Sequence, residues 1–192
     1  MVKLGVKLSH LAENSSQESR VNLLKQNTLF KFIGKEKFSS RFFEIYLQVL
    51  EFMEKHIYPN ERELINILQP LRHTENRWTK HPKIYDDLKQ IAKSDGLFNM
   101  FLKEVSNLSN LEYAVICETL GRSYSLAPEV FNCSAPDTGN MEVLFRYGTE
   151  SQKERYLKPL LDGTERSCFA MTEKGVPSSK CYKHPNYNSI WS

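Results

Sequence analysis

The strongest constraint on the fold of this 192-residue chain is an apolar stripe with the period of an α-helix. Between residues 42 and 53, large apolar side chains recur at the i, i+3, i+4, i+7 spacing that places them on one helical face. Ser39 or Ser40 precedes the stripe, and its hydroxyl is expected to accept from the free N–H groups of the first turn. The stripe consists of Phe42, Phe43, Ile45, Tyr46, Val49, Leu50 and Met53.

Proline, glycine and capping residues mark the ends of further helices. Proline fits the first turn of a helix and interrupts its interior, while glycine commonly ends one. A hydroxyl residue followed three positions later by Glu or Gln forms a capping box, in which two side chains satisfy each other's free backbone N–H groups. The polar residues 71–81 are expected to form a loop, and Pro159 is expected to bend or shorten the last helix. The expected helices begin at Pro59, Pro82, Ser109, Thr138 and Thr149 and end at Pro70, Gly96, Gly121, Gly148 and Leu161.

The helical spacing of apolar residues ends after the turn expected at Gly163. Residues 166–172 are predicted to form an extended strand. A single strand cannot satisfy its own backbone groups, so this segment needs partner strands. The sequence therefore predicts a mainly α fold that passes into the start of a β-domain.

Composition excludes several functional classes. The 26 Lys and Arg against 23 Asp and Glu leave a net charge of +3, too small to indicate a nucleic-acid partner. No stretch approaches the roughly 18 apolar residues of a membrane-spanning helix, so no membrane span is expected. The four cysteines lack metal-ligand spacing and are interpreted as reduced thiols, with no metal site. No common nucleotide, hydrolase or zinc motif occurs, and the scattered histidines are interpreted as structural.

One segment carries a recognisable signature. Residues 168–179 read CFAMTEKGVPSS, and the block FNCSAPDTGNMEVL precedes them at 131–144. The first segment resembles the flavin-binding signature of acyl-CoA dehydrogenases, and the second block resembles family members ten and eleven in particular. The resemblance extends over about residues 42–179.

The resemblance implies the N-terminal helical domain of the acyl-CoA dehydrogenase fold, FAD as cofactor, a fatty acyl-CoA substrate and a homo-oligomer. By position, Phe169 is expected to pack beside the flavin, and the backbone at Ala170 and Met171 to contact its ring. Thr172 is expected to bond the flavin edge. Ser178 and Ser179 are expected near the FAD phosphate, and Ser179 also near acyl-CoA.

The sequence also departs from the signature. Lys174 and Lys180 stand where the family carries proline and an acidic residue, and no Asp or Glu follows Glu173. The family's catalytic glutamate lies in a C-terminal helical bundle, so no catalytic residue is expected here. This indicates a truncated form that does not turn over substrate.

Four segments are expected: a linker or poorly ordered segment over 1–40, the helical domain over 41–163, the start of the β-domain over 164–179 and a divergent tail over 180–192. The family suggests an intracellular location, in mitochondria or peroxisomes. The alternative is a non-catalytic helical interaction module that associates with a full-length dehydrogenase subunit.

Overall fold

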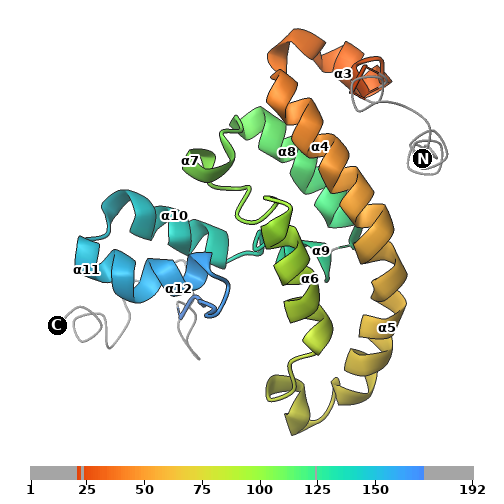
Figure 1. Cartoon of the computed structure of the whole chain (residues 1–192). Helices are drawn as coiled ribbons and strands as arrows, with labels where there is room; N and C mark the ends of the chain where they lie inside the picture. Colours follow the sequence, from red (N-terminus) through yellow and green to blue (C-terminus); the bar gives the residue numbers. More distant parts are fainter. Residues whose placement is uncertain (1–20, 23, 124, 171–192) are drawn as a thin grey trace, which may run out of the picture.

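The computed structural model describes residues 21–22, 24–123 and 125–170, and in this part of the chain all regular secondary structure is helical (Figure 1). The prediction of a mainly α fold is confirmed. The strand predicted over 166–172 is wrong for residues 166–170, which form no strand, while residues 171–172 lie outside the described residues. The physical reason is the lack of a ladder partner, because the described residues contain no strand with which these backbone groups can pair.

The apolar stripe forms the first half of the longest helix. Helix α4 (Ser40–Phe52) begins at Ser39, whose hydroxyl accepts from the Phe42 N–H at 3.0 Å, which confirms the predicted cap. The helix continues through a π-helical turn, η2 (Met53–Ile57), into α5 (Tyr58–Leu68). The two helices predicted here are thus one continuous rod, which Figure 1 shows along one side of the molecule.

Prolines account for both π-helical turns in the described residues. A proline inside an α-helix lacks an N–H donor, and its ring clashes with the carbonyl four residues earlier. Pro59 follows η2 closely, and Pro159 follows the second π-helical turn, η6 (Lys153–Leu157), in the same way. The wider π turn moves the ring past that carbonyl, so the helix continues instead of breaking. The helix therefore does not end before Pro159, and it continues beyond Leu157 as α12 (Lys158–Leu161).

The main core lies between four helices. Helix α4 packs on α8 (Asn110–Leu120), and α6 (Lys83–Ser94) packs on α9 (Ala127–Val130). Helix α6 begins after Pro82 and ends before Gly96, as predicted. The capping box of Ser109 and Glu112 is confirmed at the start of α8. The remaining short elements of this part are η3 (Gln69–Leu71), η4 (Glu75–Trp78), α7 (Lys103–Ser106) and η5 (Gly121–Ser123).

Part of the expected N-terminal linker joins this core. Helix α3 (Thr28–Ile33) and the turn η1 (Lys35–Lys37) place Phe30 edge-on against an aromatic cluster, with ring centroids 5.1 Å from Phe38 and 5.2 Å from Phe43. Phe30 and Leu24 are fully buried there. A boundary at residue 40 stays a prediction, but residues 24–38 pack as part of the helical core.

A second, smaller core forms at the other side of the molecule (Figure 1). Helix α10 (Asp137–Tyr147) packs against η6 and α12 around Met141, Leu157 and Leu160, and the short α11 (Glu150–Gln152) leads into η6. The capping box of Thr149 and Gln152 is confirmed. The prediction that Thr138 caps α10 is wrong, because the helix begins at Asp137 after Pro136, which has no N–H to satisfy.

Two kinds of feature, a membrane-spanning helix and a metal-binding cluster, are absent from the described residues. None of their helices combines the length and the apolar character that crossing a bilayer requires. They also contain no cluster of His, Cys, Asp and Glu side chains that can hold a metal ion.

Candidate functional site

The site begins where the chain leaves α12. Arg166 and Ser167 are both bound by the carboxylate of Asp137, in the first turn of α10. Ser167 donates its backbone N–H to Asp137 Oδ1 at 2.6 Å and its hydroxyl to the same oxygen at 2.5 Å. Arg166 donates from Nε to Asp137 Oδ2. Asn140, one helical turn further along α10, donates to the Ser167 hydroxyl oxygen at 2.8 Å.

Asp137 is charged although it is buried. Its side chain is 2% exposed, and burial alone raises the pKa of a carboxyl group. The hydrogen bonds from Ser167 and the interactions with Arg166 outweigh that burial and lower the pKa of Asp137. A carboxylate near a helix N-terminus also interacts favourably with the helix dipole. Asp137 is therefore a fixed negative charge at neutral pH.

An alternating chain of charges extends from this carboxylate into the main core. Arg166 also donates from an Nη atom to Glu129 of α9, and Glu129 accepts from Lys89 of α6 at 2.6 Å. The side chains of Lys89 and Glu129 are 7% and 14% exposed. Because a buried charge is costly unless it is paired, each member of the series depends on its neighbours. The series ties the segment after α12 to both helical cores.

Two asparagines hold the end of α12 from the opposite side. Asn99 donates its side-chain amide to the Leu161 carbonyl at 2.9 Å, and Asn132 donates to the Leu160 carbonyl at 2.9 Å. Asn132 also donates to the Asn99 side-chain oxygen at 2.7 Å. The last carbonyls of a helix lack partners within the helix. The Asn99 bond satisfies that of Leu161, and the Leu160 carbonyl accepts the Gly163 N–H at 3.0 Å as well as the Asn132 amide. The end of α12 is therefore fixed before the segment begins.

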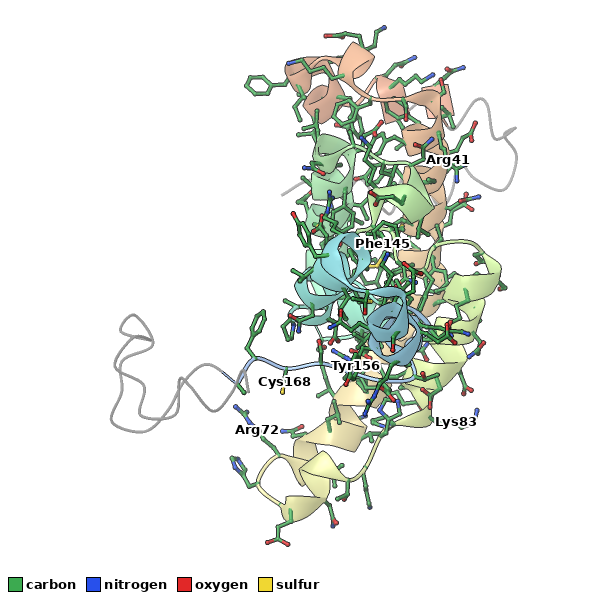
Figure 2. All side chains as sticks on the ribbon, turned by 90° about the vertical axis from the view of Figure 1, so that its left-hand side faces the viewer. Arg41, Arg72, Lys83, Phe145, Tyr156 and Cys168 are labelled. Carbon is green, nitrogen blue, oxygen red and sulfur yellow. The ribbon has the colours of Figure 1, made fainter. Side chains whose placement is uncertain are left out.

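An open cleft of about 350 Å³ lies beside the segment, between α10 and α12. Its lining combines apolar side chains with polar groups of the segment itself. Figure 2 shows Cys168 on the stretch of chain that leads away from the helices, to one side of the helical lobe that carries Tyr156. The lining residues are Asn140, Val143, Leu144, Tyr156, Leu160, Glu165, Arg166 and Ser167.

Of the predicted cofactor residues, the structure describes Phe169 and Ala170. Both are exposed, and the Phe169 side chain is 68% accessible to solvent. Their place directly after the anchored Ser167 puts them at the exit from the helical domain. Met171, Thr172, Ser178 and Ser179 lie outside the described residues, so their roles stay predictions.

Comparison with known proteins identifies the helical architecture. The profile of a family described as "Acyl-CoA dehydrogenase, N-terminal domain" matches residues 44–164. The chain belongs to the acyl-CoA dehydrogenase family. It is 53% identical over 136 residues to acyl-CoA dehydrogenase family member 11 of Gallus gallus, covering 71% of this chain and 17% of that protein. It is 49% identical over 155 residues to family member 10 of Mus musculus, covering 77% of this chain and 14% of that one.

A solved structure agrees with this assignment. A Mycobacterium abscessus protein described as an acyl-CoA dehydrogenase superposes with a TM-score of 0.67 and 45% sequence identity, covering 75% of this chain and 37% of that chain. The chain thus spans less than a fifth of the length of the curated relatives above. The matched part of the acyl-CoA dehydrogenase fold is its N-terminal domain.

The sequence reading missed the anchoring residues. Asp137 is 29 positions from Arg166, and Lys89 is 40 positions from Glu129, so no local pattern connects them. The sequence holds one signal for them. Arg166 and Ser167 directly precede the flavin signature, and an arginine at that place predicts an acidic partner elsewhere in the chain.

Proposed function

We propose that the chain is part of an FAD-dependent acyl-CoA dehydrogenase, which introduces a double bond between Cα and Cβ of a fatty acyl-CoA thioester in β-oxidation. The observation that carries this proposal is the anchored segment of Arg166 and Ser167, which leads directly from the helical domain into the flavin signature. Family membership supports the oxidoreductase chemistry.

The residues at the exit from the helical domain suit a flavin. Phe169 presents an aromatic ring that is 68% exposed, and within the described residues no main-chain hydrogen bond joins Cys168, Phe169 or Ala170 to another backbone group. An aromatic face and free backbone groups are what a planar ring with polar edges requires. Phe169, Ala170, Met171 and Thr172 would hold the ring. Ser178 and Ser179 would hold the phosphate, and Ser179 would also contact acyl-CoA.

When bound, FAD supplies the acceptor for the hydride that leaves Cβ of the substrate. The chain's own residues bind and orient the cofactor and the substrate. The proton at Cα must be taken by a base within hydrogen-bond reach, and no carboxylate follows Glu173 in the 192 residues. We therefore assign no catalytic residue within these 192 residues and propose that they do not turn over acyl-CoA by themselves. The intact family further suggests a homo-oligomer in mitochondria or peroxisomes.

A second function is favoured by one observation. Val143 and Tyr156 line the cleft and are 58% and 45% exposed, and Tyr147, one turn after Val143 on α10, is 81% exposed. Exposed apolar side chains grouped on one face are typical of a protein–protein contact. The chain would then be a helical module that associates with a full-length dehydrogenase subunit.

Titration of the 192-residue chain with FAD, followed by quenching of flavin fluorescence, tests the first function. We expect saturable binding that Phe169→Ala weakens by about two- to tenfold, the worth of one aromatic pairing. The control is Phe32→Ala, because Phe32 of α3 is 90% exposed and lies on the N-terminal helix. Absence of saturable binding, or equal affinity of both variants, contradicts the cofactor assignment. A mixed dimer without flavin supports the interaction module instead.

A separate assay addresses turnover. The chain is loaded with FAD and incubated with a fatty acyl-CoA and an artificial electron acceptor. We expect no enoyl-CoA product, and product formation by the chain alone would contradict the assignment of no catalytic residue.

A further inference from the structure

We propose that Asp137 is a positioning residue that fixes the direction in which residues 166–170 leave the helical domain, and that it thereby sets the affinity for flavin. The second half of this inference rests on the proposed function. The first half rests on the geometry around Asp137 alone.

The carboxylate holds two consecutive residues through three donors. Ser167 contributes a backbone N–H and a hydroxyl to Oδ1, and Arg166 contributes Nε to Oδ2. A backbone N–H lies in the plane of its peptide, so a bond to it orients the main chain and not just a side chain. The Asn140 amide bonds the Ser167 hydroxyl oxygen at 2.8 Å and fixes the rotation of that side chain. Together these bonds determine the orientation of the peptide before Ser167.

The carboxylate itself cannot move freely. Asp137 lies in the first turn of α10, and its side chain is 2% exposed. Its partner Arg166 is held from a second side by Glu129, which Lys89 holds in turn at 2.6 Å. The Lys89 and Glu129 side chains are 7% and 14% exposed, so the half-exposed Arg166 guanidinium is held on its inner side by a largely buried ion pair. The anchor is therefore rigid on both sides.

Beyond Ser167 this restraint ends. Cys168, Phe169 and Ala170 are exposed, and within the described part of the chain none of them forms a main-chain hydrogen bond to another backbone group. The position of the Phe169 ring therefore follows from the direction set at Ser167. If the anchor is loosened, Phe169 occupies more orientations. A ligand that binds only one orientation then has an affinity reduced by the fraction of molecules that still adopt it.

Hydrogen exchange at the Ser167 amide tests the anchor without flavin. Asp137→Asn keeps the size of the side chain and removes its charge. We expect the Ser167 amide of this variant to exchange about tenfold faster or more, the ratio that corresponds to one charge-assisted hydrogen bond. The matched control is Glu142→Gln, on the same helix, where Glu142 forms an exposed pair with Arg146 at 2.7 Å. Unchanged exchange at Ser167 in Asp137→Asn would overturn the inference.

Ser167→Ala keeps the test decisive if Asp137→Asn does not fold. This variant removes one of the two Ser167 donors and leaves every charge in place. We expect severalfold faster exchange of the residue 167 amide with unchanged helix content. An unchanged rate would overturn the inference as well.

Flavin fluorescence then tests the consequence for binding. We expect Asp137→Asn to weaken FAD binding by about tenfold or more, and to change the shape of the bound flavin's visible absorption band, while Glu142→Gln changes neither. Faster exchange at Ser167 with unchanged FAD affinity would overturn the second half. A wild-type chain that binds no flavin contradicts the proposed function and this second half together, whereas Ser167 exchange still decides whether Asp137 is the anchor.

Discussion

Glu112 joins two helices through a single carboxylate, and its replacement by glutamine tests how that joint is made. Glu112 Oε1 accepts the backbone N–H of Ser39, the capping residue of α4, at 2.7 Å. Its Oε2 accepts the backbone N–H of Ser109 at 2.7 Å and the Ser109 hydroxyl at 2.9 Å. The residue is 4% exposed, so water does not replace these bonds. One side chain thus satisfies the starts of both α4 and α8.

Glutamine has one acceptor oxygen where glutamate has two. In Glu112→Gln the NH2 group must face either Ser39 or Ser109, and one backbone donor loses its partner. A hydrogen bond to a charged group contributes about 1.5–3 kcal/mol, so we expect the free energy of unfolding to fall by about that amount. The measurement is urea unfolding followed by circular dichroism. Glu118→Gln is the control, since Glu118 is on the same helix but is exposed and pairs with Arg122 at 3.4 Å, a contact expected to contribute less than about 1 kcal/mol.

The pH dependence provides a second test of the same reasoning. Burial raises the pKa of Glu112, but the hydrogen bonds from Ser109 and Ser39 outweigh it, so the pKa is lowered on folding. A carboxyl group whose pKa is lower in the folded state stabilises the protein at pH values above its unfolded pKa of about 4.3. This stabilisation is lost as pH falls through the folded pKa. The difference between wild type and Glu112→Gln should therefore be constant from pH 7 to 5 and shrink below about pH 4. Equal stability of both variants, or a difference that persists at low pH, would refute the reasoning.

Three further changes have defined outcomes. Asn132→Ala should lower the free energy of unfolding by about 1–3 kcal/mol in urea unfolding, because the buried Asn99 side-chain oxygen loses its donor and φ at this position is 54°, while the Leu160 carbonyl keeps the Gly163 N–H; a loss below about 0.5 kcal/mol would contradict this. Gly163→Ala should lower the melting temperature by several degrees, because φ is +66° and the added Cβ would lie 2.9 Å from Phe98 Cζ; an unchanged melting temperature would show that the turn tolerates a side chain. The Cys133 thiol is partly buried, and burial raises its pKa to about 11, so it should react with a disulfide reagent at pH 7.5 far more slowly than exposed Cys168, as peptide mass spectrometry can show; equal rates would contradict this reasoning.

Local rules predicted the helices well. Both capping boxes, the Ser39 cap and the start of α6 after Pro82 depend on residues within four positions of each other, and all are present in the structure. The predicted start of α10 was wrong by two positions, since Pro136 and not Thr138 precedes the first helical residue.

Features that depend on distant contacts were not predictable in this way. A strand needs a neighbour, and the described residues offer none to residues 166–170. The π-helical turns before Pro59 and Pro159 let each helix continue past its proline, whereas the sequence rule for proline predicts an end or a bend. The anchor at Asp137 joins residues far apart in the sequence, and only the fold brings them together.

The visible absorbance spectrum of the purified 192-residue chain, recorded after incubation with excess FAD and removal of free flavin, tests the central claim most directly. If the helical domain and its anchored segment hold the cofactor, the protein keeps a near-stoichiometric flavin band. A colourless, monodisperse protein that folds with the expected helix content would contradict the claim.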